Sequence, residues 1–320
     1  TMSRIETLFT PFSFIRFFNF AQKRKAKRQA FQLTLISLNV IILARILLCG
    51  GSALGKFEKV LIASDFDGTL KNDDGIITDD VRSAIAYFIS EGGYFTVCTG
   101  RTYQGFHLYD PSYINAPVLL TNGSMAYDYE KNEPVFVNGI DAEHGIPFVR
   151  AIMENFPDVS IEMYPFDSTY AIHLDDTSHR HFTSQGIPYK VVNDPSETEF
   201  PWAKAMFDAE GISQEVQAFM RENFDDPAFL PTNGGYIEVM NKGSDKGTGL
   251  LFLADALGVP HDRTFAVGDG YNDIEMLVAA KAGFVPENGS PEALEHADYV
   301  VRSNNDGAVA NVIEILDNIL

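Results

Sequence analysis

Two short acidic segments far apart in the chain have residue types and spacings suited to chemistry. The first, DFDGTL at residues 65–70, follows an apolar run and sets the carboxylates of Asp65 and Asp67 two residues apart. Alternate residues of an extended chain point to the same side, and Gly68 lets the chain turn away at once. The second, GDGYND at residues 268–273, also follows an apolar run. One acidic turn is common in proteins, but two that converge indicate a site.

The carboxylates of these segments are candidate metal ligands: Asp65, Asp67, Asp269 and Asp273. Gathered at one place they would repel one another and raise each other's pKa unless a cation held them. Ligands that are all oxygen suit a hard divalent ion, and Mg²⁺ fits best because it takes few protein ligands and bridges to phosphate oxygens. Calcium is the alternative, but the spacing lacks the Asp/Asn ladder and closing Glu of an EF-hand loop. We therefore expect Mg²⁺ as the cofactor.

Two further segments could hold an anion. Thr99 and Gly100 end another apolar run, where a hydroxyl and free backbone N–H groups at the start of a helix form an anion site. Lys246 begins a predicted helix, and its compact ammonium could serve both a phosphate and the acidic cluster. Taken alone, the first segment also fits a plain turn and the second a solvated lysine. Their weight comes from their position relative to the acidic turns.

Strands that alternate with helices must position these residues. Short apolar runs without alternation are typical of strands buried on both faces of a parallel sheet. We predict an α/β fold with a doubly wound parallel sheet, whose carboxyl edge carries the acidic turns. The predicted strands are 60–64, 94–99, 117–121, 264–267, 283–285 and 299–301. One predicted helix is capped by Thr78, two others cover 246–257 and 272–280, and a last helix begins at 308.

A second domain is predicted as an insertion in the first. Between 122 and 235 aromatic residues and turn signals multiply, and the segment holds six basic and twenty acidic residues. We expect the core domain at 56–122 and 236–320 and an inserted α/β domain at 123–235. It should cover the carboxyl ends of the strands, where open α/β sheets bind ligands. Candidates for its lining, each of a type that is found more often in a core or on a surface than in contact with a ligand, are Tyr164, Phe166, His173, Trp202 and Tyr236.

Composition limits the classes of protein and partner. With 320 residues, 45% hydrophobic and 21% charged, the chain is neither wholly disordered nor collagen-like nor a multi-span membrane protein. Cys49 and Cys98 are too few for a disulfide framework or a four-cysteine zinc site. Residues 56–320 carry sixteen basic and 43 acidic residues, and such a surface repels phosphodiester backbones. We expect a small molecule as partner and no nucleic acid.

The first 55 residues differ from the rest. They contain eight basic residues and one acidic residue, with a basic cluster at 23–28 ahead of an apolar stretch at 33–49. This leader fits either an extension without function or a single membrane anchor, oriented by the upstream positive charge. We expect a cytoplasmic protein, with a membrane-anchored form as the alternative and membrane contact only through residues 31–49.

The four segments, in this order, resemble the motifs of the haloacid dehalogenase-like phosphohydrolases over about residues 57–320. DFDGTL at 65–70 looks like the first motif of that superfamily, Thr99 the second, Lys246 the third and GDGYND at 268–273 the fourth. The insertion is similar to the large α/β cap of the Cof-like sugar-phosphatase branch, and LTNG at 120–123 looks like the entry into that cap.

This resemblance implies a Mg²⁺-dependent phosphomonoester hydrolase that acts on small phosphorylated metabolites such as sugar phosphates. Asp65 is then the nucleophile that forms an aspartyl phosphate, and Asp67 is the acid and base. The implied metal ligands are Asp65, the backbone carbonyl of Asp67, Asp269 and, directly or through water, Asp273. The implied phosphate-binding residues are Thr99, Gly100, Lys246 and Asn272. Two alternatives stay open: a phosphomutase or phosphotransferase of the same superfamily, and a non-catalytic module that binds metal or phosphate.

Overall fold

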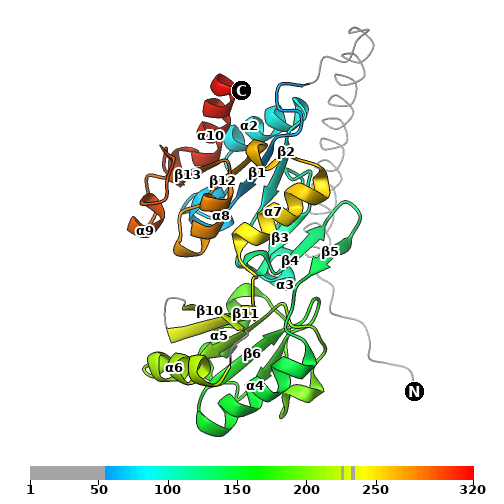
Figure 1. Cartoon of the computed structure of the whole chain (residues 1–320), viewed down its shortest axis with the longest axis vertical. Coiled ribbons are helices and arrows are strands. Elements are labelled where there is room, and N and C mark those ends of the chain that lie inside the picture. Colours follow the sequence, from blue (N-terminus) through cyan, green and yellow to red (C-terminus); the bar gives the residue numbers. More distant parts are fainter. Residues whose placement is uncertain (1–54, 225–226, 232–234) are drawn as a thin grey trace, which may run out of the picture. The chain divides into compact units, whose positions relative to one another are not determined.

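The computed structural model describes residues 55–224, 227–231 and 235–320 of the chain (Figure 1). The leader predicted at 1–55, with its possible membrane contact at 31–49, lies outside the described residues except for Gly55. Within the described ranges, none of the helices combines the length and the apolar character that a membrane crossing requires.

A five-stranded parallel sheet, ordered β14-β13-β12-β1-β2, forms the core domain. Register pairs Ser64 at the end of β1 with Val267 at the end of β12. The two acidic turns therefore leave the sheet at the same level of the same edge. The strands are β1 (Leu61–Ser64), β2 (Tyr94–Val97), β12 (Thr264–Val267), β13 (Ala282–Pro286) and β14 (Tyr299–Val301).

Helices cover both faces of this sheet, which confirms the predicted doubly wound fold. Along β1, Ile62 packs in a cluster with α2 and α10, whereas Leu61 and Ala63 pack in a second cluster with α7 and α8. The apolar run is thus buried on both sides, as the absence of alternation indicated. The helices of the core domain are α2 (Asp79–Ser90), α3 (Tyr103–Phe106), α7 (Lys246–Leu257), α8 (Ile274–Ala279), α9 (Pro291–Leu294) and α10 (Ala308–Ile319).

A small antiparallel sheet continues from the edge of the core. It consists of β3 (Val118–Leu120), β4 (Met125–Asp128) and β5 (Glu133–Val137), and a parallel bridge between Cys98 and Leu119 joins β3 to the end of β2. Cys98 is fully buried in the α7 side of the core, where it packs as a small residue.

A six-stranded sheet, ordered β10-β11-β9-β6-β7-β8, forms the second domain, and the two faces of this sheet differ. On one face Ile161, Phe207 and Ile237 pack against α4 and α6. Their neighbours in sequence point to the other face, because side chains alternate along a strand. The elements are β6 (Ser160–Tyr164), β7 (Tyr170–Ile172), β8 (Lys190–Val191), β9 (Lys204–Asp208), β10 (Pro227–Pro231), β11 (Tyr236–Asn241), α4 (Ala142–Asn155), α5 (Asp176–Gln185) and α6 (Ser213–Asn223).

The predicted limits of this domain, 123–235, stay a prediction, and the strand pairing bears on them. Strand β11 begins after the predicted end, yet it pairs with β9 and β10. Strand β4 begins after the predicted start but pairs with β3. The prediction rested on the aromatic residues and turn signals between 122 and 235, which do not show how strands pair. We propose instead that the insertion begins after Asn138 and ends at Asn241, whose side chains share a 2.9 Å hydrogen bond.

Candidate functional site

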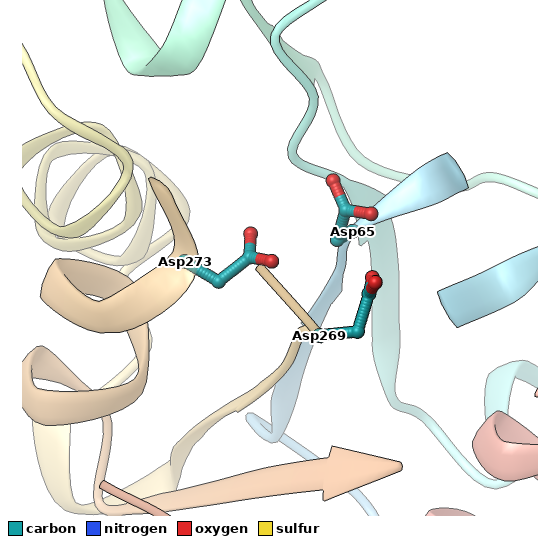
Figure 2. A group of neighbouring side chains, drawn as sticks. All are labelled: Asp65, Asp269 and Asp273. Atoms are coloured by element: carbon teal, nitrogen blue, oxygen red, sulfur yellow. The ribbon is translucent and has the colours of Figure 1, made fainter. Parts of the chain in front are cut away.

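Three carboxylates meet at the carboxyl edge of the parallel sheet. Asp65 follows β1, Asp269 follows β12, and Asp273 directly precedes α8. One carboxylate oxygen from each lies within 4.8 Å of the other two, and the three side chains converge in Figure 2. The predicted convergence of the two acidic turns is therefore present in the structure.

The close approach of the two turns depends on Gly68. Its φ of +83° lies in the left-handed region, and a Cβ added there would stand 2.6 Å from Oδ2 of Asp269. The neighbouring Thr69 donates a 2.6 Å hydrogen bond to Oδ1 of Asp269. We had not singled out Thr69 from the sequence, although its place inside the DFDGTL run was the available signal. Together these two residues join one acidic turn to the other.

Lys246 lies between two of the carboxylates and is fully buried. Its Nζ donates to Oδ1 of Asp65 at 2.6 Å and to Oδ1 of Asp273 at 2.5 Å. Burial by itself would lower the pKa of Lys246, but the negative charges of Asp273 and Asp65 raise it, so the side chain stays an ammonium. Lys246 thus meets the acidic cluster as predicted. It does not line the adjacent cavity, so direct phosphate contact by Lys246 stays a prediction.

The cluster has the charge and the donor atoms for a hard divalent cation. Burial raises the pKa of Asp65 to about 8, Lys246 opposes this shift, and the charges of Asp273 and Asp269 add to it. In the described residues no hydrogen bond reaches Oδ2 of Asp65 or Oδ2 of Asp269. Both oxygens of Asp273 are taken, by Lys246 and by the backbone N–H of Gly270 at 2.8 Å. Asp65 and Asp269 are therefore the side chains best able to hold Mg²⁺, which prefers oxygen ligands.

Asp67 stands apart from the carboxylate cluster. Its side chain is 48% exposed and binds two cations: Nε of Arg101 donates to Oδ2 at 2.6 Å, and Nζ of Lys71 lies 2.6 Å from Oδ1. Burial would raise the pKa of Asp67, but the hydrogen bonds from Arg101 and Lys71 outweigh it and lower the pKa. The ion pairs with Arg101 and Lys71 were not foreseen from the sequence. The metal contact predicted for Asp67 runs through its backbone carbonyl and stays a prediction.

A cavity of about 340 Å³ opens over the acidic cluster. Thr99, Gly100 and Asn272 line it, so three of the predicted phosphate-binding residues face the same space. Oγ1 of Thr99 accepts a 3.2 Å hydrogen bond from the backbone N–H of Arg101. The side-chain amide of Asn272 donates to Oδ1 of Asn122 at 3.0 Å.

The six-stranded sheet, α5 and the segment after α5 supply the other wall of the cavity. The residues of this wall are Tyr164, His181, Gln185, Ile187, Lys204, Met206 and Glu238. Only Tyr164 was among the candidates drawn from the sequence. The signal for Lys204 and Met206 was their alternation with buried apolar residues along one strand, which could be recognised only with the sheet in hand.

The remaining four candidates for the cavity lining lie elsewhere in the inserted domain. Trp202 is fully buried in the apolar core against α4. The ring of Phe166 lies 5.0 Å from that of Tyr103, and His173 is exposed. Tyr236 lies near the wall without lining the cavity, its ring 5.7 Å from that of His181.

Comparisons with a family model and with curated proteins indicate the same family for this chain. A sequence model described as haloacid dehalogenase-like hydrolase matches residues 62–313. A Streptococcus pyogenes protein named as a phosphatase, without a stated substrate, is 27% identical over 273 residues, which cover 79% of this chain and 96% of that protein. The 5-amino-6-(5-phospho-D-ribitylamino)uracil phosphatase YcsE of Bacillus subtilis is 29% identical over 265 residues, covering 79% of this chain and 94% of that protein.

Solved structures with the same fold cover the second domain as well as the core. A phosphatase of the haloalkanoate dehalogenase superfamily from Bacteroides thetaiotaomicron superposes with a TM-score of 0.71 at 20% identity, covering 84% of this chain and 99% of that chain. A subclass IIB sugar phosphatase superposes with a TM-score of 0.70 at 18% identity, covering 81% of this chain and 99% of that chain. At these identities the similarity shows the fold.

Proposed function

Since the chain belongs to the haloacid dehalogenase-like hydrolase family, we propose that it is a phosphatase that hydrolyses small phosphate monoesters with Asp65 as the nucleophile. The observation that carries this proposal is the cluster at the carboxyl edge of the sheet, where Asp65, Asp269 and Lys246 meet below one cavity. Relatives that are named as phosphatases and span most of the chain support it.

Asp65 is held with one oxygen fixed and the other free. Asp65 lines the cavity and Lys246 binds its Oδ1, so Oδ2 is the proposed attacking atom. A bond forms between this oxygen and the phosphorus while the ester P–O bond breaks, which leaves an aspartyl phosphate. Water then attacks the same phosphorus, and Asp65 is released as a carboxylate. Phosphoryl transfer of this kind depends mainly on positioning and charge neutralisation.

Asp67 is the proposed proton donor and acceptor. It would give a proton to the leaving alkoxide and later take one from the attacking water. In the structure its carboxylate is bound to Arg101 and Lys71, which lower its pKa and favour the ionised form, so it would have to rotate away from these cations to hold the proton that it gives to the leaving group. We infer that this rotation accompanies substrate binding.

The proposed metal ion is Mg²⁺, held by Oδ2 of Asp269 and by Oδ1 of Asp65, which has a second lone pair besides the one that Lys246 binds, with the backbone carbonyl of Asp67 and with Asp273 in support. Oδ2 of Asp65 then stays free to attack. When bound there, Mg²⁺ would supply positive charge that stabilises the negative charge of a phosphoryl group. Thr99 and Gly100 lie across the same cavity and are the proposed donors to the remaining phosphoryl oxygens.

The proposed substrates are small polar phosphate esters such as sugar phosphates. A cavity of about 340 Å³ limits the size of the leaving group, and its wall mixes hydrogen-bonding side chains such as His181 with apolar ones such as Met206. The name of the Bacillus subtilis relative, a phosphatase for a phosphorylated ribityl compound, supports a polyhydroxylated leaving group.

A panel of phosphomonoesters tests the proposal directly. The full chain would be assayed for release of inorganic phosphate from sugar phosphates, nucleotides and 5-amino-6-(5-phospho-D-ribitylamino)uracil, with Mg²⁺ and with EDTA. We expect release that requires Mg²⁺. Transfer of phosphate between hydroxyls without release would indicate a phosphomutase. Absence of any turnover, with Mg²⁺ still bound, would indicate the non-catalytic module.

A further inference from the structure

A chain of four polar side chains runs from the inserted domain to the acidic turns. Nζ of Lys204 on β9 donates to Oε1 of Glu238 on β11 at 2.8 Å. Oε2 of Glu238 accepts from Nδ2 of Asn122 at 2.9 Å, and Oδ1 of Asn122 accepts from Nδ2 of Asn272 at 3.0 Å. Lys204, Glu238 and Asn122 are all buried. The last member, Asn272, lines the cavity beside the acidic cluster.

The chemistry of these groups fixes the direction of every hydrogen bond in the chain. A lysine ammonium only donates and a carboxylate only accepts, so Glu238 must receive hydrogen bonds from both sides. Asn122 therefore turns its NH₂ group to Glu238 and is left with its oxygen for Asn272. Asn272 in turn must offer its own NH₂ group to Asn122.

This direction decides which atom Asn272 presents to the cavity. One N–H of its amide binds Asn122, and the second N–H of the same nitrogen is left to donate to a ligand. Its oxygen lies against the backbone at Gly270, where an added Cβ would stand 2.8 Å away. A phosphoryl oxygen needs a donor, so this orientation is the one that favours phosphate.

The backbone at Asn122 supports the same arrangement. Its φ is +51°, a left-handed conformation that Asn tolerates better than most residues other than Gly. At the next residue, Gly123, an added Cβ would stand 2.2 Å from the backbone oxygen of Asp245, directly before Lys246. The turn at 121–123 is thus tightly packed, and the Asn122 side chain is held between the two domains.

We propose that Glu238 is a positioning residue that acts through Asn122 to hold the NH₂ group of Asn272 toward a phosphate in the cavity. The proposal rests on the proposed phosphatase function. It assigns a task to two residues, Glu238 and Asn122, that lie outside the acidic turns, and it makes the orientation of a core side chain depend on a strand of the inserted domain.

The variant Glu238→Gln tests the direction of the chain. The new amide must keep its oxygen toward Lys204, so its NH₂ group faces Asn122 and forces the Asn122 amide to turn over. Asn272 then has to present its oxygen to Asn122, and the N–H directed at phosphate is lost. We expect kcat/KM to fall about tenfold to one-hundredfold, and the inhibition constant of inorganic phosphate to rise by a similar factor, as for one lost hydrogen bond to a charged group.

The double variant Glu238→Gln with Asn122→Asp supplies the rescue. The amide at position 238 can donate to the new carboxylate at position 122, which can only accept, so Asn272 again offers its NH₂ group. The net charge of the pair equals that of the wild type. We expect kcat/KM and phosphate inhibition to return to within about threefold of wild type, and Glu238→Gln to have no further effect in an Asn272→Ala background.

Controls separate this proposal from the loss of fold and from the phosphatase proposal. Asp194→Asn removes a carboxylate from the exposed pair with Arg150 in the same domain, and it should leave both constants unchanged. Thermal unfolding of each variant checks the fold.

If the wild type releases no phosphate from any ester, the phosphatase proposal fails, and calorimetric titration with inorganic phosphate and Mg²⁺ still tests the chain of hydrogen bonds. Three outcomes would each overturn the inference. Glu238→Gln could bind phosphate as well as the wild type does, or the double variant could bind it no better than Glu238→Gln does. The third outcome is a wild type that binds no phosphate.

Discussion

The acidic site of the core and the opposite wall of the cavity are built in different ways. In the core, Asp65, Thr69 and Asp269 come from two short turns, and each bonds to a residue of the other turn or to the buried Lys246. The wall draws its residues from three strands, one helix and the segment that follows this helix, and the strand residues stand at alternate positions. The proposed chemistry is thus encoded in contiguous segments, whereas the proposed selectivity depends on a sheet being assembled first. The two regions should respond differently to substitution.

The largest effect is expected at the centre of the core. Asp65→Asn replaces the proposed nucleophile with an amide, so phosphate release should fall by at least about a thousandfold while the protein stays folded. Release of inorganic phosphate and circular dichroism measure the two outcomes. The exposed Asp158→Asn in the inserted domain is the control and should retain full turnover. An Asp65→Asn protein with Mg²⁺-dependent activity near that of the wild type would rule out the assignment.

The next largest effect is expected at Asp67. Asp67→Asn should allow slow phosphorylation of Asp65 but leave the water without a base, so turnover should fall about one-hundredfold to ten-thousandfold. Protein-bound phosphate should accumulate and can be measured after acid quenching. Lys71→Met removes one ion pair but keeps the carboxylate, and it should not accumulate the phosphorylated protein. Equal accumulation in both variants would contradict the role of Asp67.

A moderate effect is expected from pH and metal on the stability of the core. The pKa of Asp65 is raised from 3.8 to about 8, so the folded metal-free protein keeps a proton that the unfolded chain releases. This contribution to stability is complete below about pH 4 and is lost as pH rises through about 8. Bound Mg²⁺ would take the place of the proton, so its addition should raise the unfolding temperature by several degrees at pH 8 and less at pH 5. Equal shifts at both pH values, measured by scanning calorimetry, would exclude metal binding by this cluster.

The smallest effect is expected in the wall. His181 lines the cavity, and its Nδ1 lies 2.9 Å from Oε2 of the buried Glu162. His181→Ala should raise KM up to about tenfold for a sugar phosphate while KM for acetyl phosphate, which does not reach the wall, stays the same. His179→Ala on the same helix contacts Tyr189 instead and is the matched control. A change in kcat of similar size for both substrates would indicate that His181 takes part in the reaction itself. The acidic site and the opposite wall of the cavity would then not differ in role as proposed.

The sequence predicted the core more fully than the inserted domain, for physical reasons. The runs at 60–64 and 264–267 are apolar without alternation, which is typical of a parallel strand buried on both faces, and the helix predicted at 246–257 coincides with α7. Since parallel strands end at one edge, the meeting of Asp65 with Asp269 followed from the motifs alone. The architecture of the inserted domain depends instead on pairing between strands that are distant in sequence.

Inside the insertion, strand pairing could not be read from local pattern. The local pattern at 236–241 does not indicate that this run pairs with β9, so the predicted boundary fell at 235 and Glu238 was assigned no role. Trp202 was named as a candidate because of its size and type, but its ring fills the space beside α4. The ion pair between Arg101 and Asp67 was also not predicted from the sequence. These residues are 34 positions apart and meet only because β1 and β2 lie side by side.

The hydrogen bond between Asn138 and Asn241 has an evolutionary consequence. It brings the two proposed ends of the insertion next to each other. A segment with adjacent ends can be exchanged by recombination with little disturbance to its host, as in other domain insertions. Replacement of the inserted domain could then change which leaving groups the protein accepts. The replacing domain would again have to supply a hydrogen-bond acceptor for Asn122.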